Sequence, residues 1–160
     1  MSSNLPIIRQ VNWFSLIPQT LLMFSLLYIY EKIKMSNPFL YGILTYLVIS
    51  FVLRFGIAKN HRNGITLVKK KDFENAIAEF KKSYEFFSKN KWLDDYRVLF
   101  LLSSSKISYR EMALCNIAFC YSQIQKGFEA IEFYEKAIRE FPKSELAKAG
   151  LNILKSVNVN

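Results

Sequence analysis

The hydrophobic pattern divides the chain into two unlike parts, which meet near residue 57. Residues 11–30 carry no charged side chain, and residues 38–57 carry only Arg54. A helix that crosses a bilayer needs roughly 20 mainly apolar residues, because each residue advances about 1.5 Å along the helix axis. The sequence therefore predicts a two-helix transmembrane hairpin over residues 1–57, with these two stretches as its spans.

Two other interpretations of the apolar stretches are less favoured. Buried helices of a soluble core would need a larger partner layer than the remaining residues supply. A cleavable signal peptide would have a shorter apolar run, followed by a small-x-small cleavage site that this chain lacks. Asn37 and Pro38 are also the residue types that cap and begin a helix, so they mark the start of the second span.

After residue 58 the pattern changes to the period of an amphipathic helix. Apolar residues recur at steps of three and four, with charged residues between them. Asp72, Ser108 and Ser144 mark expected helix starts, and Ser108 has the spacing of a capping box with the glutamate three residues later. A turn at 125–127 precedes a further helix. No segment alternates with period two for long enough to form a strand. We therefore predict an all-α fold that ends in a capping helix at 144–155.

Two of the expected helical hairpins are alike when they are compared 54 residues apart. Small residues allow close helix approach in both copies, and an aromatic ring fills the space beside them. The corresponding pairs are Gly64 and Ala118, Leu67 and Tyr121, Ala76 and Ala130, Phe80 and Tyr134, Ser83 and Ala137, and Ser88 and Pro142.

The second copy resembles the tetratricopeptide repeat. That family has a pattern of large apolar, small, aromatic, small, aromatic and proline residues, which this chain meets with Leu114, Ile117, Ala118, Tyr121, Ala130, Tyr134 and Pro142. The resemblance implies repeats at about 57–90 and 111–144 within a domain of residues 58–160. The first copy departs from the pattern at Asn60, Asn63 and Ser88. The offset of 54 residues, where the family has 34, leaves an insert at 91–110.

The insert is more apolar than a surface loop, so we predict an additional or lengthened helix there. Two roles remain open for it: packing that closes the gap between the hairpins, or a flap that binds a partner. Its charged residues Asp94, Asp95 and Arg97 are interpreted as solvent-exposed. No proline separates the second span from Gly64, so we expect that span to continue into the first helix of the first repeat.

The formal net charge of +9 comes almost entirely from the membrane part and its flank. Residues 72–160 carry 13 basic and 12 acidic groups, so a nucleic-acid partner is not expected. The positive-inside rule predicts a two-pass membrane protein with both termini in the cytoplasm, because basic residues follow the second span. We expect a bacterial inner membrane; a mitochondrial or endoplasmic-reticulum membrane fits nearly as well. The membrane-surface basic residues are Arg54, Lys59, Arg62, Lys69, Lys70 and Lys71.

No pattern of catalytic or metal-binding residues stands out. His61 is the single histidine, and it has no neighbouring acid or thiol to form a ligand set or a triad. Cys115 and Cys120 are five residues apart on a helix and face different directions. The sequence has no phosphate-binding glycine loop and no nucleophile elbow. We therefore expect no enzyme activity, no metal and no cofactor.

The resemblance implies a protein-binding function. The first helix of each repeat would line a groove for a helix or an extended segment of a partner protein. We expect a membrane-anchored adaptor or scaffold; the alternative is a structural subunit of a membrane channel, transporter or secretion complex. Two repeats are few, so a homo-oligomer or a larger membrane complex fits both hypotheses. The implied groove residues are His61, Ile65, Val68, Met112, Cys115, Asn116, Phe119, Ser122 and Gln123.

Overall fold

The computed structural model describes residues 13–157 of the chain. This part is helical apart from short turns and one irregular segment, and it contains no β-strand, so the all-α prediction is confirmed for these residues. The elements are η1 (Trp13–Ser15), α1 (Leu16–Lys32), α2 (Pro38–Val52), η2 (Leu53–Ile57), α3 (Lys59–Lys69), α4 (Phe73–Lys89), α5 (Lys91–Asp95), α6 (Arg97–Phe100), α7 (Tyr109–Gln123), α8 (Gly127–Glu140) and α9 (Glu145–Val157).

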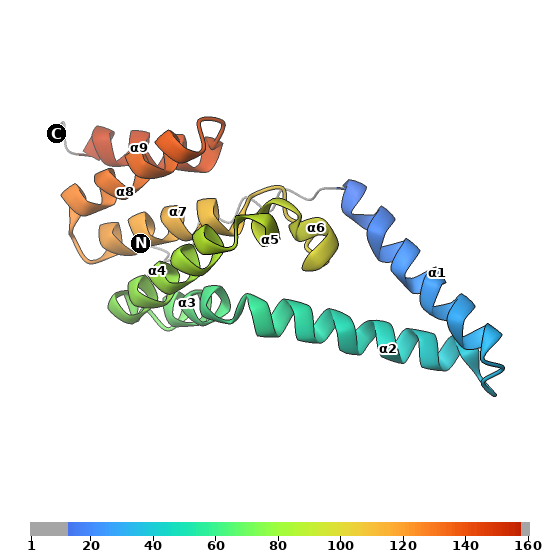
Figure 1. Cartoon of the computed structure of the whole chain (residues 1–160). Coiled ribbons are helices and arrows are strands. Elements are labelled where there is room, and N and C mark those ends of the chain that lie inside the picture. The colour runs from blue at the N-terminus through green and yellow to red at the C-terminus, as the bar shows by residue number, and fades with distance from the viewer. Residues whose placement is uncertain (1–12, 158–160) are drawn as a thin grey trace.

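Helices α1 and α2 form a hairpin that stands apart from the other helices (Figure 1). They meet at the turn after α1 and diverge toward the rest of the molecule. Tyr30 and Thr45 share a hydrogen bond of 2.8 Å, and Gly42 lies directly against Leu27, where a Cβ would be 2.6 Å from a methyl carbon. The helical stretches Trp13–Lys32 and Pro38–Ile57 are each 20 residues long and apolar enough to cross a membrane. The first two residues of the expected first span lie outside the described residues.

The second apolar helix runs almost directly into the first helix of the larger part. The π-helical segment η2 follows α2, and the single residue Ala58 separates it from α3 (Figure 1). The Arg62 guanidinium lies 3.4 Å from the centre of the Phe55 ring and so joins the two sides of this junction. The second span therefore continues into the first helix of the larger part, as predicted, through a π-helical segment and a single non-helical residue.

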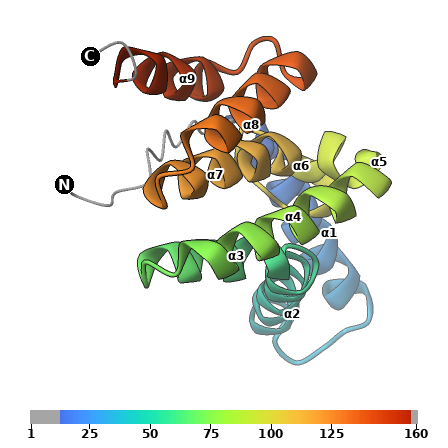
Figure 2. The same ribbon diagram turned by 90° about the vertical axis from the view of Figure 1, so that its left-hand side faces the viewer.

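The remaining helices form one stack, in which α3 and α4 are followed by α7, α8 and α9 (Figure 2). Helix α4 packs against both α3 and α7, and α8 packs between α7 and α9. The short helices α5 and α6 lie at the end of this stack that faces the apolar hairpin (Figure 1).

The turn between α3 and α4 closes with a Schellman motif. Lys71 has a left-handed backbone with φ of 62°. The Asp72 N–H donates to the Leu67 carbonyl at 3.0 Å, and the Lys71 N–H donates to the Val68 carbonyl at 2.9 Å. The Asp72 carboxylate then caps α4 by accepting the Asn75 N–H at 3.4 Å.

The turn between α7 and α8 has the same geometry 54 residues later. Gln125 has φ of 61°, and the Lys126 N–H donates to the Tyr121 carbonyl at 3.0 Å. The Gln125 N–H donates to the Ser122 carbonyl at 3.4 Å. The two helical hairpins therefore share their turn as well as the small and aromatic positions in the sequence.

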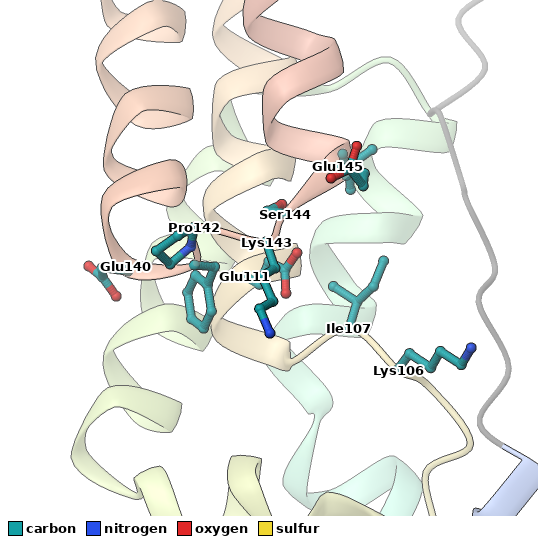
Figure 3. Close-up of a pocket in the computed structure, with 10 residues that line it drawn as sticks. Lys106, Ile107, Glu111, Glu140, Pro142, Lys143, Ser144 and Glu145 are labelled. Carbon is teal, nitrogen blue, oxygen red and sulfur yellow. The ribbon is translucent and has the colours of Figure 1, made fainter.

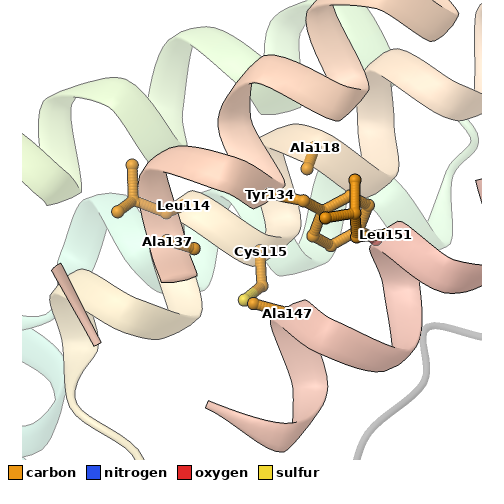
Figure 4. Packing of buried hydrophobic residues seen from close by; sticks show 7 residues of the cluster. All are labelled: Leu114, Cys115, Ala118, Tyr134, Ala137, Ala147 and Leu151. Carbon is orange, nitrogen blue, oxygen red and sulfur yellow. The ribbon is translucent and has the colours of Figure 1, made fainter. Parts of the chain in front are cut away.

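Aromatic rings against small residues form the core of the stack. Phe80 is fully buried, and its ring occupies the place where a Cβ on Gly64 would lie. Tyr134 meets Gly150 of α9 in the same way, and Ala76 and Ala130 are fully buried. Figure 4 shows the cluster around Tyr134, which joins α7, α8 and α9 through Leu114, Cys115, Ala118, Tyr134, Ala137, Ala147 and Leu151.

Candidate binding surface and membrane junction

The insert is folded, and it packs against the N-terminus of α7. Asp94 of α5 is completely buried, and its two carboxylate oxygens accept the backbone N–H groups of Tyr109 at 2.7 Å and Arg110 at 3.1 Å. The Arg110 Nε also donates to this carboxylate at 3.2 Å. Ser108 accepts the Glu111 N–H at 3.1 Å, so side chains satisfy three N–H groups of the first turn of α7.

The Arg97 side chain binds the irregular segment that connects the insert to α7. Its guanidinium donates to the Asp94 carbonyl at 2.9 Å, to the Ser105 carbonyl at 3.1 Å and to the Lys106 carbonyl. The interpretation of Asp94 and Arg97 as solvent-exposed charges is therefore wrong. Asp95 is exposed and pairs with Arg110 at 3.5 Å. Sequence reasoning missed this cluster because its partners are separated by 15 residues, which no helical period connects.

The end of the insert joins the stack to the apolar hairpin. Leu101 is buried against Ala58 and Phe87, at the junction of η2, α3 and α4. The next residue, Leu102, is also buried, and its left-handed backbone turns its carbonyl to accept the Gln19 side-chain amide of α1 at 3.1 Å. A polar residue of the first apolar helix is therefore satisfied by the insert.

The implied groove residues lie on α3 and α7, on either side of α4. His61, Val68 and Cys115 are buried in the core, so a partner could reach them only if the helices separated. Fewer of the implied groove residues are accessible than the sequence indicated, because side chains that face the next helix in the stack cannot also face solvent. The half-buried residues are Ile65, Met112, Asn116, Phe119 and Ser122, and Gln123 is exposed.

His61 lies in an aromatic cage between α3, α4 and α7. Its ring meets the edges of Phe80 and Tyr109 at centroid distances of 5.4 and 5.3 Å, and its Nδ1 is 3.4 Å from the Ser83 hydroxyl. Burial lowers the pKa of His61 from 6.5 to about 4, because the cage disfavours the charged imidazolium. The imidazole is therefore neutral at physiological pH and forms part of the core.

This burial predicts a pH-dependent stability. Below pH 6.5 the unfolded chain binds a proton at His61 that the folded chain does not bind until about pH 4. The free energy of unfolding should therefore fall by about 1.4 kcal/mol per pH unit across that range, and His61 should contribute no pH dependence above it. Urea unfolding of the full chain in detergent micelles at pH 7 and pH 5 measures the change. The control His61→Gln should show a smaller loss, and an equal loss in both proteins would contradict the assignment.

The two cysteines are protonated core residues. Burial raises the pKa of Cys115 and of Cys120 to about 12, and no disulfide joins them. Among the described residues, no group of three or more His, Cys, Asp or Glu side chains could hold a metal ion.

The six basic residues do not form a single patch. Lys59 and Arg62 lie on the first turn of α3, beside η2, and Arg54 lies within η2. Lys69, Lys70 and Lys71 lie at the opposite end of α3, about 15 Å further along the helix axis. A Debye length is about 8 Å at physiological ionic strength, so a charged surface level with η2 would attract Lys59 and Arg62 far more than the three lysines at the other end of α3.

A cavity of about 490 Å³ opens between the return from the insert and the turn that joins α8 to α9. Lys106 and Ile107 form one side, Glu111 projects from α7, and the segment from Glu140 to Leu146 forms the other side (Figure 3). Its lining combines the apolar side chains of Ile107, Phe141, Pro142 and Leu146 with charged groups of both signs.

The chain was compared with protein-family models, with curated proteins and with solved structures, and none of them matches it. Function must therefore be inferred from the geometry of the chain itself.

Proposed function

We propose that this chain is a membrane-anchored adaptor of the tetratricopeptide type. The apolar hairpin would cross a membrane twice, with both termini in the cytoplasm, and the helical stack would bind partner proteins at the membrane surface. The bacterial inner membrane is the proposed location. The observation that carries this proposal is a duplicated helical hairpin that continues without a loop from an apolar helix long enough to span a bilayer.

The likeness of the α3–α4 and α7–α8 hairpins supports the proposal that they are repeats of one structural unit. The Schellman turns centred on Lys71 and Gln125 are 54 residues apart, and the buried rings Phe80 and Tyr134 have the same separation. Phe80 packs against Gly64 of the preceding helix, whereas Tyr134 packs against Gly150 of the following helix. A stack of such hairpins buries a continuous core and leaves one helix of each pair free to face a partner.

The anchoring part is supported by the exposure of the hairpin. Large apolar side chains such as Leu21, Phe24, Leu47 and Phe51 are each more than half exposed. Such a surface is unstable in water and matches the hydrocarbon of a bilayer. Two helices of 20 residues are each about 30 Å long, which equals the thickness of the hydrocarbon core.

The rival hypothesis, a subunit that works within the membrane, predicts that polar residues of the first span face other transmembrane helices. In this chain Gln19 donates to the insert, and the Thr20 hydroxyl donates to the Ile17 carbonyl of its own helix. Because both side chains are satisfied within the chain, they give no reason for a further transmembrane partner. Asn12 lies outside the described residues. The internal hydrogen bonds of Gln19 and Thr20 therefore favour the adaptor hypothesis over the membrane-subunit hypothesis.

Site-specific photo-crosslinking in intact membranes tests the adaptor. A crosslinking side chain at the exposed groove position Gln123 should form adducts with a defined protein, identified by mass spectrometry. The same side chain at Glu132, an exposed position on α8, should not capture that protein. The rival predicts adducts from Phe24 on the lipid-facing side of α1 and none from Gln123, and that result would overturn the proposal.

A further inference from the structure

Exposed apolar side chains are concentrated at one end of the helical stack. Between residues 58 and 157, seven large apolar side chains are exposed, and five of them lie in the short segment from 86 to 100. Single exposed apolar residues are ordinary, but a cluster of this kind marks an interaction surface. The five residues are Phe86, Trp92, Tyr96, Leu99 and Phe100.

This cluster lies level with the first turns of the apolar hairpin. Helix α6 contacts α1, and Gln19 of α1 donates to the Leu102 carbonyl at 3.1 Å. Gln19 is six residues after Trp13, so the contact is about 9 Å along the span from its start. Figure 1 shows α6 at the mouth of the diverging hairpin. The insert therefore sits beside the end of the span and not above it.

We propose that the face formed by Trp92, Tyr96, Leu99 and Phe100 lies in the headgroup and upper acyl region of the bilayer. This face would contact lipid in addition to the two apolar helices. The inference rests on the proposed membrane anchoring, and it gives the insert a role of its own. Trp92, Tyr96 and Leu99 are 52, 63 and 54% exposed. Trp and Tyr favour this depth because their rings are apolar and their N–H and O–H groups reach water.

The chemistry around the face suits a lipid surface. The Trp92 and Phe100 rings pack edge to face with centroids 5.1 Å apart, so the two short helices present them together. Lys89 and Lys91 are exposed just before Trp92, where ammonium groups can meet anionic headgroups. The buried Asp94 carboxylate is paired with Arg110, and the exposed Asp95 carboxylate of the same helix also lies 3.5 Å from Arg110.

The exposed face of the insert adjoins the exposed apolar surface of the hairpin, so lipid is favoured over a protein as the molecule that covers it. Trp13 and Phe14 at the start of α1 are 76 and 77% exposed, so the apolar surface of the span already begins at this level. Lipid that surrounds α1 reaches the insert without any further partner. Leu101 packs against Ala58 and Phe87, and the Leu102 carbonyl accepts the Gln19 side chain of α1, so the face is held in a fixed position relative to the span.

Tryptophan fluorescence in vesicles tests this inference. The chain has two tryptophans, so Trp13→Phe leaves Trp92 as the single reporter. The full chain is reconstituted into vesicles of phosphatidylcholine and phosphatidylglycerol whose acyl chains carry bromine either near the headgroup or near the chain end. Trp92 should lose most of its fluorescence to lipid brominated near the headgroup and little to lipid brominated near the chain end.

Two matched proteins separate this inference from the proposed anchoring. Trp92→Phe leaves Trp13, which should be quenched if the hairpin is inserted. Trp13→Phe/Trp92→Phe/Phe128→Trp places the reporter at the far end of the stack, where Phe128 is 91% exposed, and it should remain unquenched. If Trp13 is quenched and Trp92 is not, the lipid contact is wrong while the anchoring stands. A blue-shifted but unquenched Trp92 would mean that a protein surface or a second copy covers the face. If neither Trp13 nor Trp92 is quenched, the anchoring and this inference both fail.

Discussion

Asp94→Ala should lower the free energy of unfolding of the helical stack by about 3 kcal/mol. The substitution removes the acceptor of two backbone N–H groups at the start of α7 and leaves them without a partner in a buried place. It also leaves Arg110, whose side chain is only 13% exposed, without its closest carboxylate. Urea unfolding of the full chain in detergent micelles, followed by circular dichroism, measures the change.

Asp95→Ala is the matched control for this experiment. The neighbouring carboxylate also pairs with Arg110, at 3.5 Å, but it is 60% exposed. Its removal should cost less than about 1 kcal/mol. Equal losses of stability for the two variants would show that Asp94 acts only as a charge near Arg110. The assignment of Asp94 as a cap of α7 would then be wrong.

Phe80→Ala should lower the free energy of unfolding by about 4 kcal/mol, because it leaves a cavity in the centre of the first hairpin. The ring is completely buried and fills the space beside Gly64 between α3 and α4. The same unfolding measurement applies. Phe128→Ala is the control, because that ring is 91% exposed and its removal should change stability by less than about 0.5 kcal/mol.

The close approach of Gly64 to Phe80 adds a second test of the same packing. A Cβ at residue 64 would lie 2.7 to 2.8 Å from three ring carbons, so Gly64→Ala should be destabilising by about 1–3 kcal/mol. In a Phe80→Leu background the smaller side chain can move aside, and the cost of Gly64→Ala should shrink. Additive effects in this double-mutant cycle would contradict the packing. Gly127→Ala, with no atom within 4 Å of the added Cβ, serves as the control.

Local patterns were enough to predict the helices and several of their ends. Ser108 and Asp72 accept the N–H groups three residues later, as their positions before apolar periodic segments indicated. These signals depend on residues three or four apart, so they are readable in the sequence. The same holds for the two apolar helices, whose length and composition are properties of continuous segments.

The turns of the stack show where the sequence was less informative. Lys71 and Gln125 adopt left-handed conformations without being glycine or asparagine, so the residue type alone did not mark the turn. The hydrogen bonds of the Schellman motif and the ends of the packed helices hold the backbone there.

Periodicity and residues close together in the chain were enough to predict the helical class and the two long apolar helices. Tertiary structure decided which side chains are accessible and how the insert is used. Neighbouring helices exclude water from His61, Val68 and Cys115, which are therefore core residues. They also bury Asp94, which caps α7. The contact between Gln19 and Leu102 joins residues 83 apart, and only the packing of the insert between hairpin and stack could bring them together.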